Sequence, residues 1–286
     1  MLETTVSIRN GLFRTFVRSA GSGAPLLFLH GAGGLHTWPA FLDALAHMFR
    51  VIAPEHPGFG RSEGLEHLDD VVDLALYYTE FMDAMGLEEP YVVGHSLGGM
   101  IGAEVAAITP ERVSKLVLIS PVGLWLDEHP VMDFFSATPE DLASALFHNP
   151  ASPTAKEMLA FPSDPDAQLE AMLERTKNLT AAGKFLWPIP DKGLKKRIHR
   201  ISAPTLLLWG ASDRLISPVY GEEFLKRIDG AQLAVLKGAG HMLPFEKPDE
   251  FVEVLTDFLS PSRAHLIRPD VHPALGSAQM VDPVLR

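Results

Sequence analysis

The chain has 286 residues, of which 47% are hydrophobic and 21% charged, and its formal net charge at pH 7 is −12. This ordinary globular composition excludes a disordered or fibrous protein, and the acidic charge disfavours binding to nucleic acid or to acidic lipid surfaces. Because the chain contains no cysteine, disulfides, a thiolate nucleophile and a cysteine-ligated zinc ion are excluded as well.

The first predicted elements are two strands of a hairpin. Residues 3–18 alternate in polarity around Asn10-Gly11, a dipeptide that accepts the positive φ angles of a tight turn, so an antiparallel edge is expected. Residues 25–29 form a continuous apolar run, which is typical of a strand buried on both faces. A glycine-rich loop follows over residues 30–34.

Strands and helices then alternate along the chain. Strands are predicted over residues 50–53, 91–94, 115–120, 204–210 and 232–237, and helices over residues 69–85, 97–108, 218–228 and 248–259. This alternation predicts the α/β class, with a mostly parallel central sheet and helices on both of its faces.

One long segment, residues 122–201, interrupts the alternation. It contains helical stretches separated by prolines and no convincing buried strand, which indicates a helical cap inserted between two strands. Ligands of open α/β sheets bind outside the carboxyl ends of the strands, so the cap should cover the site. We therefore expect a core of residues 1–121 and 202–262, a cap of residues 122–201 and an extended tail of residues 263–286.

The strongest local motif is Gly94-His95-Ser96-Leu97-Gly98-Gly99, which lies between a predicted strand and a predicted helix. A serine on such a sharp turn needs small neighbours so that the turn can close while the hydroxyl points outward. The amides at the start of the following helix would face a developing oxyanion. This context predicts that Ser96 is a nucleophile rather than a mere helix cap.

A serine nucleophile requires a base and an orienting acid. Asp213 and His241 each follow a predicted strand, so the carboxyl ends of three strands bring Ser96, Asp213 and His241 to one edge of the sheet. Asp127 or Glu128 is the alternative acid if Asp213 is only a turn residue.

These motifs together resemble the α/β-hydrolase superfamily, in particular its capped esterases, lactonases, haloperoxidase-like enzymes and carbon–carbon bond hydrolases. The resemblance covers residues 3–121 and 202–260. It implies an oxyanion hole formed by the amides of Leu97 and of Ala32, or alternatively of Gly33. The loop over residues 53–62 also matches, although Glu55 stands where the family commonly has an aspartate.

Several further side chains are candidates for a role near the site. The resemblance favours structural roles for His30 and His95, with ring nitrogens bonded to the backbone. Most cap aromatics should form the cap's own core, and a minority should line an apolar acyl pocket. The candidate substrate-binding residues are Gly33, His95, Trp187 and Met242.

The predicted activity is hydrolysis of carboxylic esters or lactones through an acyl-enzyme. A carbon–carbon hydrolase of the meta-cleavage type is an alternative, but such enzymes usually carry an Asn after the oxyanion loop and a Trp after the catalytic His. This chain has Leu35-His36-Thr37-Trp38 and Met242 in those regions. A cofactor-independent dioxygenase and a ligand receptor that retains the triad are further alternatives.

Neither a cofactor nor a metal is expected, since the mechanism needs none and the histidines lack metal-ligand spacing. The expected partner is a small-molecule substrate, with no nucleic acid and no membrane, and the oligomeric state stays open, a homodimer included. Residues 1–10 lack a basic stretch followed by an apolar core, and no apolar run reaches about 18 residues, so a cytoplasmic location is expected.

Overall fold

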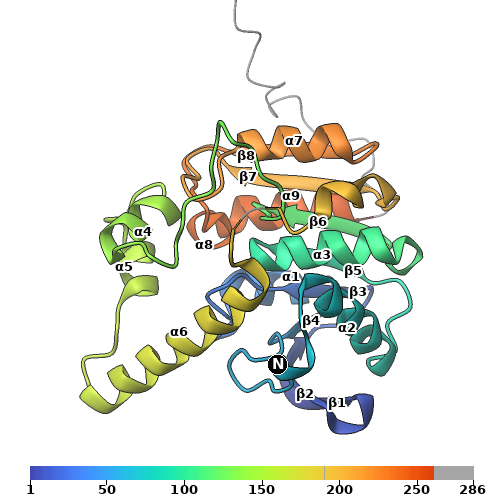
Figure 1. Ribbon diagram of the computed structural model, residues 1–286, viewed down its shortest axis with the longest axis horizontal. Helices are drawn as coiled ribbons and strands as arrows, with labels where there is room; N and C mark the ends of the chain where they lie inside the picture. Colours follow the sequence, from blue (N-terminus) through green and yellow to red (C-terminus); the bar gives the residue numbers. More distant parts are fainter. Residues whose placement is uncertain (190, 261–286) are drawn as a thin grey trace, which may run out of the picture.

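The computed structural model describes residues 1–189 and 191–260, which form an α/β structure around one eight-stranded sheet (Figure 1). The strand order is β1-β2-β4-β3-β5-β6-β7-β8. Strands β3 to β8 run parallel, and β2 is antiparallel to both β1 and β4. The strands are β1 (Leu2–Ile8), β2 (Phe13–Ala20), β3 (Pro25–Leu29), β4 (Arg50–Pro54), β5 (Tyr91–His95), β6 (Lys115–Ile119), β7 (Thr205–Gly210) and β8 (Gln232–Leu236).

The mostly parallel sheet and its antiparallel edge confirm the predicted fold class. The turn between β1 and β2 is a short 3-10 segment, Arg9–Gly11, in which Asn10 adopts a left-handed φ of 55°. Asn tolerates this conformation better than most residues, which is why the dipeptide marked the turn.

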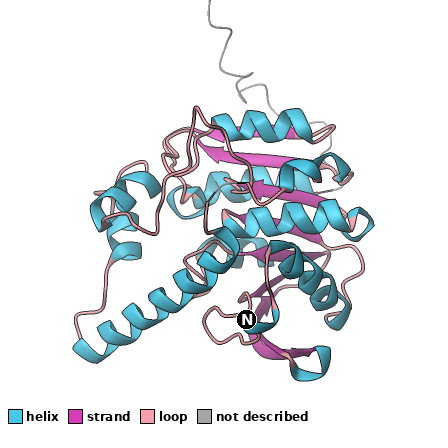
Figure 2. Cartoon of the chain, in the orientation of Figure 1, coloured by secondary structure: helices cyan, strands magenta, loops and turns pink. Residues whose placement is uncertain are grey.

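Helices pack on both faces of the sheet (Figure 2). In β3, Leu27 and Leu29 join one hydrophobic core, whereas Leu26 and Phe28 join the other, as expected for a strand covered on both sides. The first face is covered by α2 (Val71–Ala84), α3 (Leu97–Ile108) and α7 (Val219–Arg227), and the second by α1 (Ala40–Ala46), α8 (Leu243–Glu246) and α9 (Pro248–Leu259).

The predicted helices are found within two residues of their expected bounds, whereas α1 and α8 were not predicted. These two helices have only seven and four residues, too few for a helical period to stand out from the sequence.

The described residues of the segment between β6 and β7 contain three α-helices, two short 3-10 helices (Leu194–Lys196 and Ile198–Arg200) and no strand. The three α-helices are α4 (Pro139–Leu146), α5 (Pro153–Leu159) and α6 (Pro165–Leu186), and each begins with a proline preceded by a capping side chain. The three helices project to one side of the sheet in Figure 1. The expected helices are therefore present, while the division into a core and a cap domain stays a prediction, and the tail of residues 263–286 lies outside the described residues.

Candidate active site

Ser96 lies on a tight turn between β5 and α3 and has φ 55° and ψ −113°, a conformation that L residues rarely adopt. The flanking glycines make this turn possible. A Cβ at Gly98 would lie 2.0 Å from the Leu29 carbonyl oxygen, and one at Gly94 would lie 2.2 Å from the Gly98 carbonyl oxygen. The motif around Ser96 is thus required by close backbone packing, as the sequence indicated.

The structure joins Asp213 and His241 in a buried pair. Asp213 follows β7 and His241 follows β8, so both leave the carboxyl edge of the sheet. The Nδ1–H of His241 donates to Oδ2 of Asp213 over 2.8 Å, and both side chains are almost completely buried. This bond fixes the imidazole with Nε2 as its free acceptor.

The second carboxylate oxygen of Asp213 is held by the backbone. Its Oδ1 accepts hydrogen bonds from the amides of Leu215 (3.0 Å) and Ile216 (2.9 Å), which fix the carboxylate in place. The alternative acids are placed elsewhere, because Asp127 and Glu128 are both exposed and Asp127 accepts from the indole of Trp125. Of the three candidates, Asp213 is the one that contacts His241.

His95 is hydrogen-bonded to the loop that carries His241. Its buried ring donates from Nε2 to the His241 carbonyl oxygen over 2.9 Å. Burial and repulsion by His241 lower the pKa of His95 to about 3, so this ring is neutral and serves as a hydrogen-bond donor. Ser96, the next residue, is half-buried, and no hydrogen bond joins its hydroxyl to His241 within the described part of the chain. Such bonds are often long in substrate-free enzymes.

The two expected oxyanion amides lie at the start of α3 and in the loop after β3. Leu97 is the first residue of α3, where an amide has no intrahelical acceptor. Ala32 follows β3 in the loop whose Gly31 packs against the elbow, since a Cβ there would lie 3.4 Å from the Ser96 Cβ. Gly33 is exposed, and its carbonyl oxygen accepts from Asn178 of α6 over 3.1 Å. The assignment of Ala32 and Leu97 stays a prediction.

Two buried histidines connect the loop after β3 to the loop after β4. The Nε2 of His30 accepts from the His56 amide, and the His56 Nε2–H donates to the His30 carbonyl oxygen. The Tyr78 hydroxyl is hydrogen-bonded to the remaining ring nitrogen of His56. Burial lowers the pKa of His56 to about 4 and that of His30 well below its ordinary value. The expected structural role of His30 is thereby confirmed.

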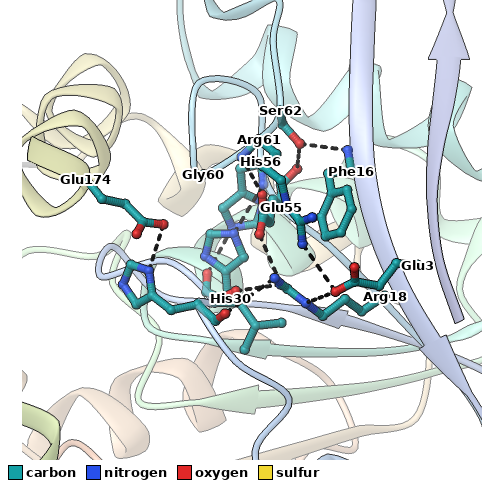
Figure 3. Close-up of polar contacts among 12 residues, drawn as sticks. Glu3, Phe16, Arg18, His30, Glu55, His56, Gly60, Arg61, Ser62 and Glu174 are labelled. Atoms are coloured by element: carbon teal, nitrogen blue, oxygen red, sulfur yellow. Dashed lines mark hydrogen bonds and ion pairs between the residues drawn. The ribbon is translucent and has the colours of Figure 1, made fainter. Parts of the chain in front are cut away.

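Glu55, the residue that departs from the family pattern, is the centre of a buried ionic network (Figure 3). Its carboxylate accepts from Arg18 Nη1 over 3.0 Å and from the Arg61 amide over 2.6 Å. Arg18 also donates to the carbonyl oxygens of Leu35 and His36, which lie in the loop after β3. The network therefore links β2 to the loops after β3 and β4.

Asn178 has a positioning role that sequence reasoning missed. It is only 1% exposed, donates to the Gly33 carbonyl oxygen and accepts from the Gly60 amide over 3.1 Å. A single asparagine in a polar helix carries no pattern that would reveal these contacts.

Two proposed substrate-binding residues occupy different surroundings. Met242 is half-buried directly after His241, and its amide donates to the Leu146 carbonyl oxygen over 3.0 Å. Trp187 is 55% exposed at the end of α6 and packs edge-on against Phe135. Helix α6 ends with the Trp187 ring facing solvent, and the expected roles of Trp187 and Met242 in substrate binding stay predictions.

A sequence profile described as alpha/beta hydrolase fold matches residues 24–248, and the chain belongs to this family. Among curated relatives, 2-hydroxy-6-oxo-6-phenylhexa-2,4-dienoate hydrolase from Burkholderia cepacia is 29% identical over 87% of this chain and 92% of its own length. The dihydrolipoyllysine-residue acetyltransferase component of the acetoin cleaving system from Cupriavidus necator is 30% identical over 87% of this chain and 67% of its own length.

Solved structures agree on the fold. A membrane phospholipase A described as a bacterial virulence factor has a TM-score of 0.75 and 26% identity, over 90% of this chain and 85% of that one. A serine hydrolase involved in carbazole degradation has a TM-score of 0.72 and 24% identity, over 90% and 98%. Within the described residues, no helix is both long and apolar enough to cross a membrane.

Proposed function

We propose that this hydrolase cleaves carboxylic esters or lactones of small apolar or aromatic compounds through an acyl-enzyme on Ser96. The observation that carries the proposal is the buried Asp213–His241 hydrogen bond at the same sheet edge as the strained Ser96 turn. Nothing in this arrangement requires a cofactor, since the base, its orienting acid and the nucleophile are all side chains of the chain.

The mechanism follows from the orientation of the imidazole. With Nδ1–H bonded to Asp213, the Nε2 of His241 takes the Ser96 proton as Oγ attacks the carbonyl carbon. The amides of Leu97 and Ala32 donate hydrogen bonds to the negatively charged oxygen of the tetrahedral intermediate. His241 then protonates the leaving alcohol, and a water molecule activated by the same nitrogen releases the acid.

Carbon–carbon bond hydrolysis is a second candidate, because several curated relatives are named as hydrolases of 2-hydroxy-6-oxo dienoates. A dienoate carries a carboxylate that needs a cationic partner. In this chain, Arg197 at the end of the cap segment is bound in bidentate fashion to the buried Glu104, with both contacts at 2.7 Å. This ion pair occupies one cation of the cap segment. The ester or lactone proposal is supported by Leu35–Trp38 and Met242, which stand in the positions where an Asn and a Trp were sought.

A substrate screen of the wild type and Ser96→Ala decides between these candidates. We expect turnover of acyl esters or lactones, and a Ser96→Ala variant that folds normally and loses nearly all of it, with a residual rate about 10³ to 10⁴ above water. Faster turnover of a meta-cleavage product would favour carbon–carbon hydrolysis. Oxygen consumption that survives in Ser96→Ala would indicate a dioxygenase, and tight ligand retention without turnover a receptor.

A further inference from the structure

The carboxyl-terminal end of α4 is buried against the loops that carry the catalytic pair. A helix leaves its last carbonyl groups without intrahelical partners, and this end therefore attracts donors and positive charge. Phe147, the C-cap residue that follows α4, is 1% exposed. Ala145 is buried as well, whereas Ser144 and Leu146 are partly buried, so the last turn of this helix packs against the core on one side.

The donors that reach these carbonyl groups come from residues adjacent to the acid and the base. Arg214, which follows Asp213, donates from its amide to Ala145 (3.3 Å) and from Nη1 to Ser144 (2.9 Å) and Phe147 (3.3 Å). Met242, which follows His241, donates from its amide to Leu146. One helix end thus binds both neighbours of the Asp213–His241 pair.

Glu246, the last residue of α8, also connects the end of α4 to the loop that carries His241. Its Oε2 accepts from the Gly240 amide over 2.7 Å, and its Oε1 accepts from the His148 amide over 2.8 Å. Gly240 precedes His241, and His148 follows the end of α4, so one carboxylate joins the base loop to the cap segment. The packing is close, since a Cβ at Gly240 would lie 2.7 Å from the Leu146 carbonyl oxygen.

We propose that the end of α4 positions the Asp213–His241 pair, with Arg214 and Glu246 as the positioning residues that hold it. The cap segment then acts on the chemical step as well as on substrate entry. This inference rests on the proposed serine hydrolase function. The physical basis is that a catalytic group displaced by about 1 Å can cost on the order of a hundredfold in rate.

The test compares Glu246→Gln and Arg214→Met with the wild type on a small activated ester and on a bulky aryl ester. We expect each variant to lower kcat by about tenfold to a hundredfold, by the same factor on both esters, with KM unchanged. The double variant should lose less than the product of the two losses, because both side chains hold one element. Arg214→Lys, which keeps a cationic donor, should recover part of the loss and serves if Arg214→Met fails to fold.

Matched controls separate positioning from general support of the fold. Arg112 also donates to backbone carbonyl oxygens, those of Leu87 and Glu88, but away from the catalytic loops, and Glu250 of α9 pairs with Lys247. Arg112→Met and Glu250→Gln should leave kcat unchanged. Unchanged kcat in Glu246→Gln and Arg214→Met, a change in KM alone, or an equal loss in the controls would overturn the proposal.

A second readout does not depend on ester turnover. The Nδ1 proton of His241 can be followed by proton NMR, and we expect its exchange with water to be faster in Glu246→Gln and Arg214→Met than in the wild type and both controls. If the wild type hydrolyses no ester but this difference is observed, the proposed function fails and the positioning role stands. Equal exchange in all of these proteins would refute the positioning role.

Discussion

The Asp213 carboxylate shows how one side chain can be fixed for a single task. It accepts two backbone amides on one oxygen and the His241 ring on the other, and its side chain has no exposed surface. In the proposed mechanism, an anion in this position orients the imidazole and stabilises its protonated form. The same contacts would not suit a neutral amide, because an NH₂ group facing a backbone N–H leaves both donors unsatisfied.

Replacement of the acid should therefore damage turnover more than folding. Asp213→Asn is expected to lower kcat by about 10⁴, since the amide favours the wrong histidine tautomer. The exposed Asp127 and Glu128 provide controls, and Asp127→Asn and Glu128→Gln should have near wild-type rates on the same ester. Steady-state kinetics of the three variants check this, and an active Asp213→Asn would mean that the acid is misassigned.

The turn between β5 and α3 depends on glycine for a steric reason. At Gly98 an added methyl group would overlap the backbone oxygens of Leu29 and His30, at 2.0 and 2.6 Å. Backbone atoms of a central strand cannot move aside as a flexible side chain can.

Overpacking of a protein core typically costs about 1 to 3 kcal/mol. Gly98→Ala should lower the free energy of unfolding by more than this, and it should abolish activity. Gly183→Ala is the matched control, because its Cβ would meet only Phe135 at an ordinary distance of 3.8 Å inside α6. That change should stabilise the protein by up to about 1 kcal/mol. Urea unfolding measures both, and equal stability of the two variants would contradict the steric explanation.

Of the helices between β6 and β7, α6 should contribute little to substrate choice through Trp187, which follows its last residue. A change inside an apolar pocket alters preference by about 1 to 3 kcal/mol, but this ring is mostly exposed. Phe135, which is partly buried and stacked on Phe134, is the better candidate. Trp187→Ala should therefore shift the ratio of kcat/KM between short-chain and aryl esters less than Phe135→Ala does. The reverse order would show that Trp187 contacts the substrate.

At the scale of the whole molecule, the buried neutral histidines should make the free energy of unfolding fall when the pH is lowered below neutrality. The folded-state pKa of His56 is about 4 and that of His95 about 3, both below the ordinary value of 6.5, so the unfolded state binds protons first. Stability that is fully present above about pH 6.5 is then lost as the pH falls toward these values, by about 1.4 kcal/mol per pH unit for each histidine.

Urea unfolding at several pH values between 7 and 5 checks this dependence. His56→Gln should be less stable than the wild type at pH 7, yet lose stability with a shallower slope because one titrating group is gone. His47 is exposed at the end of α1 and gives the control His47→Gln, which should keep the wild-type slope. An unaltered slope in His56→Gln would mean that this ring is protonated in the folded state.

Much of the fold could be predicted because its signals are local. Apolar runs such as residues 25–29 and 205–210 form buried strands, and the glycines around Ser96 mark a turn whose geometry needs them. Short elements such as α1 and α8 escaped prediction because they contain too few residues to show a period.

In the candidate site, too, some residues could be predicted from local sequence signals and others could not. Ser96, Asp213 and His241 could be proposed from the sequence because each follows a strand, and parallel strands end at one edge of a sheet. The roles of Asn178, Arg214 and Glu246, the exclusion of Asp127 and Glu128 as partners of His241, and the exposure of Trp187 required the folded arrangement. These depend on contacts between segments far apart in the chain, such as the 145 residues that separate Asn178 from Gly33. A local sequence pattern determines whether a segment forms a helix, a strand or a turn, whereas the contacts of a side chain depend on how distant segments pack against one another.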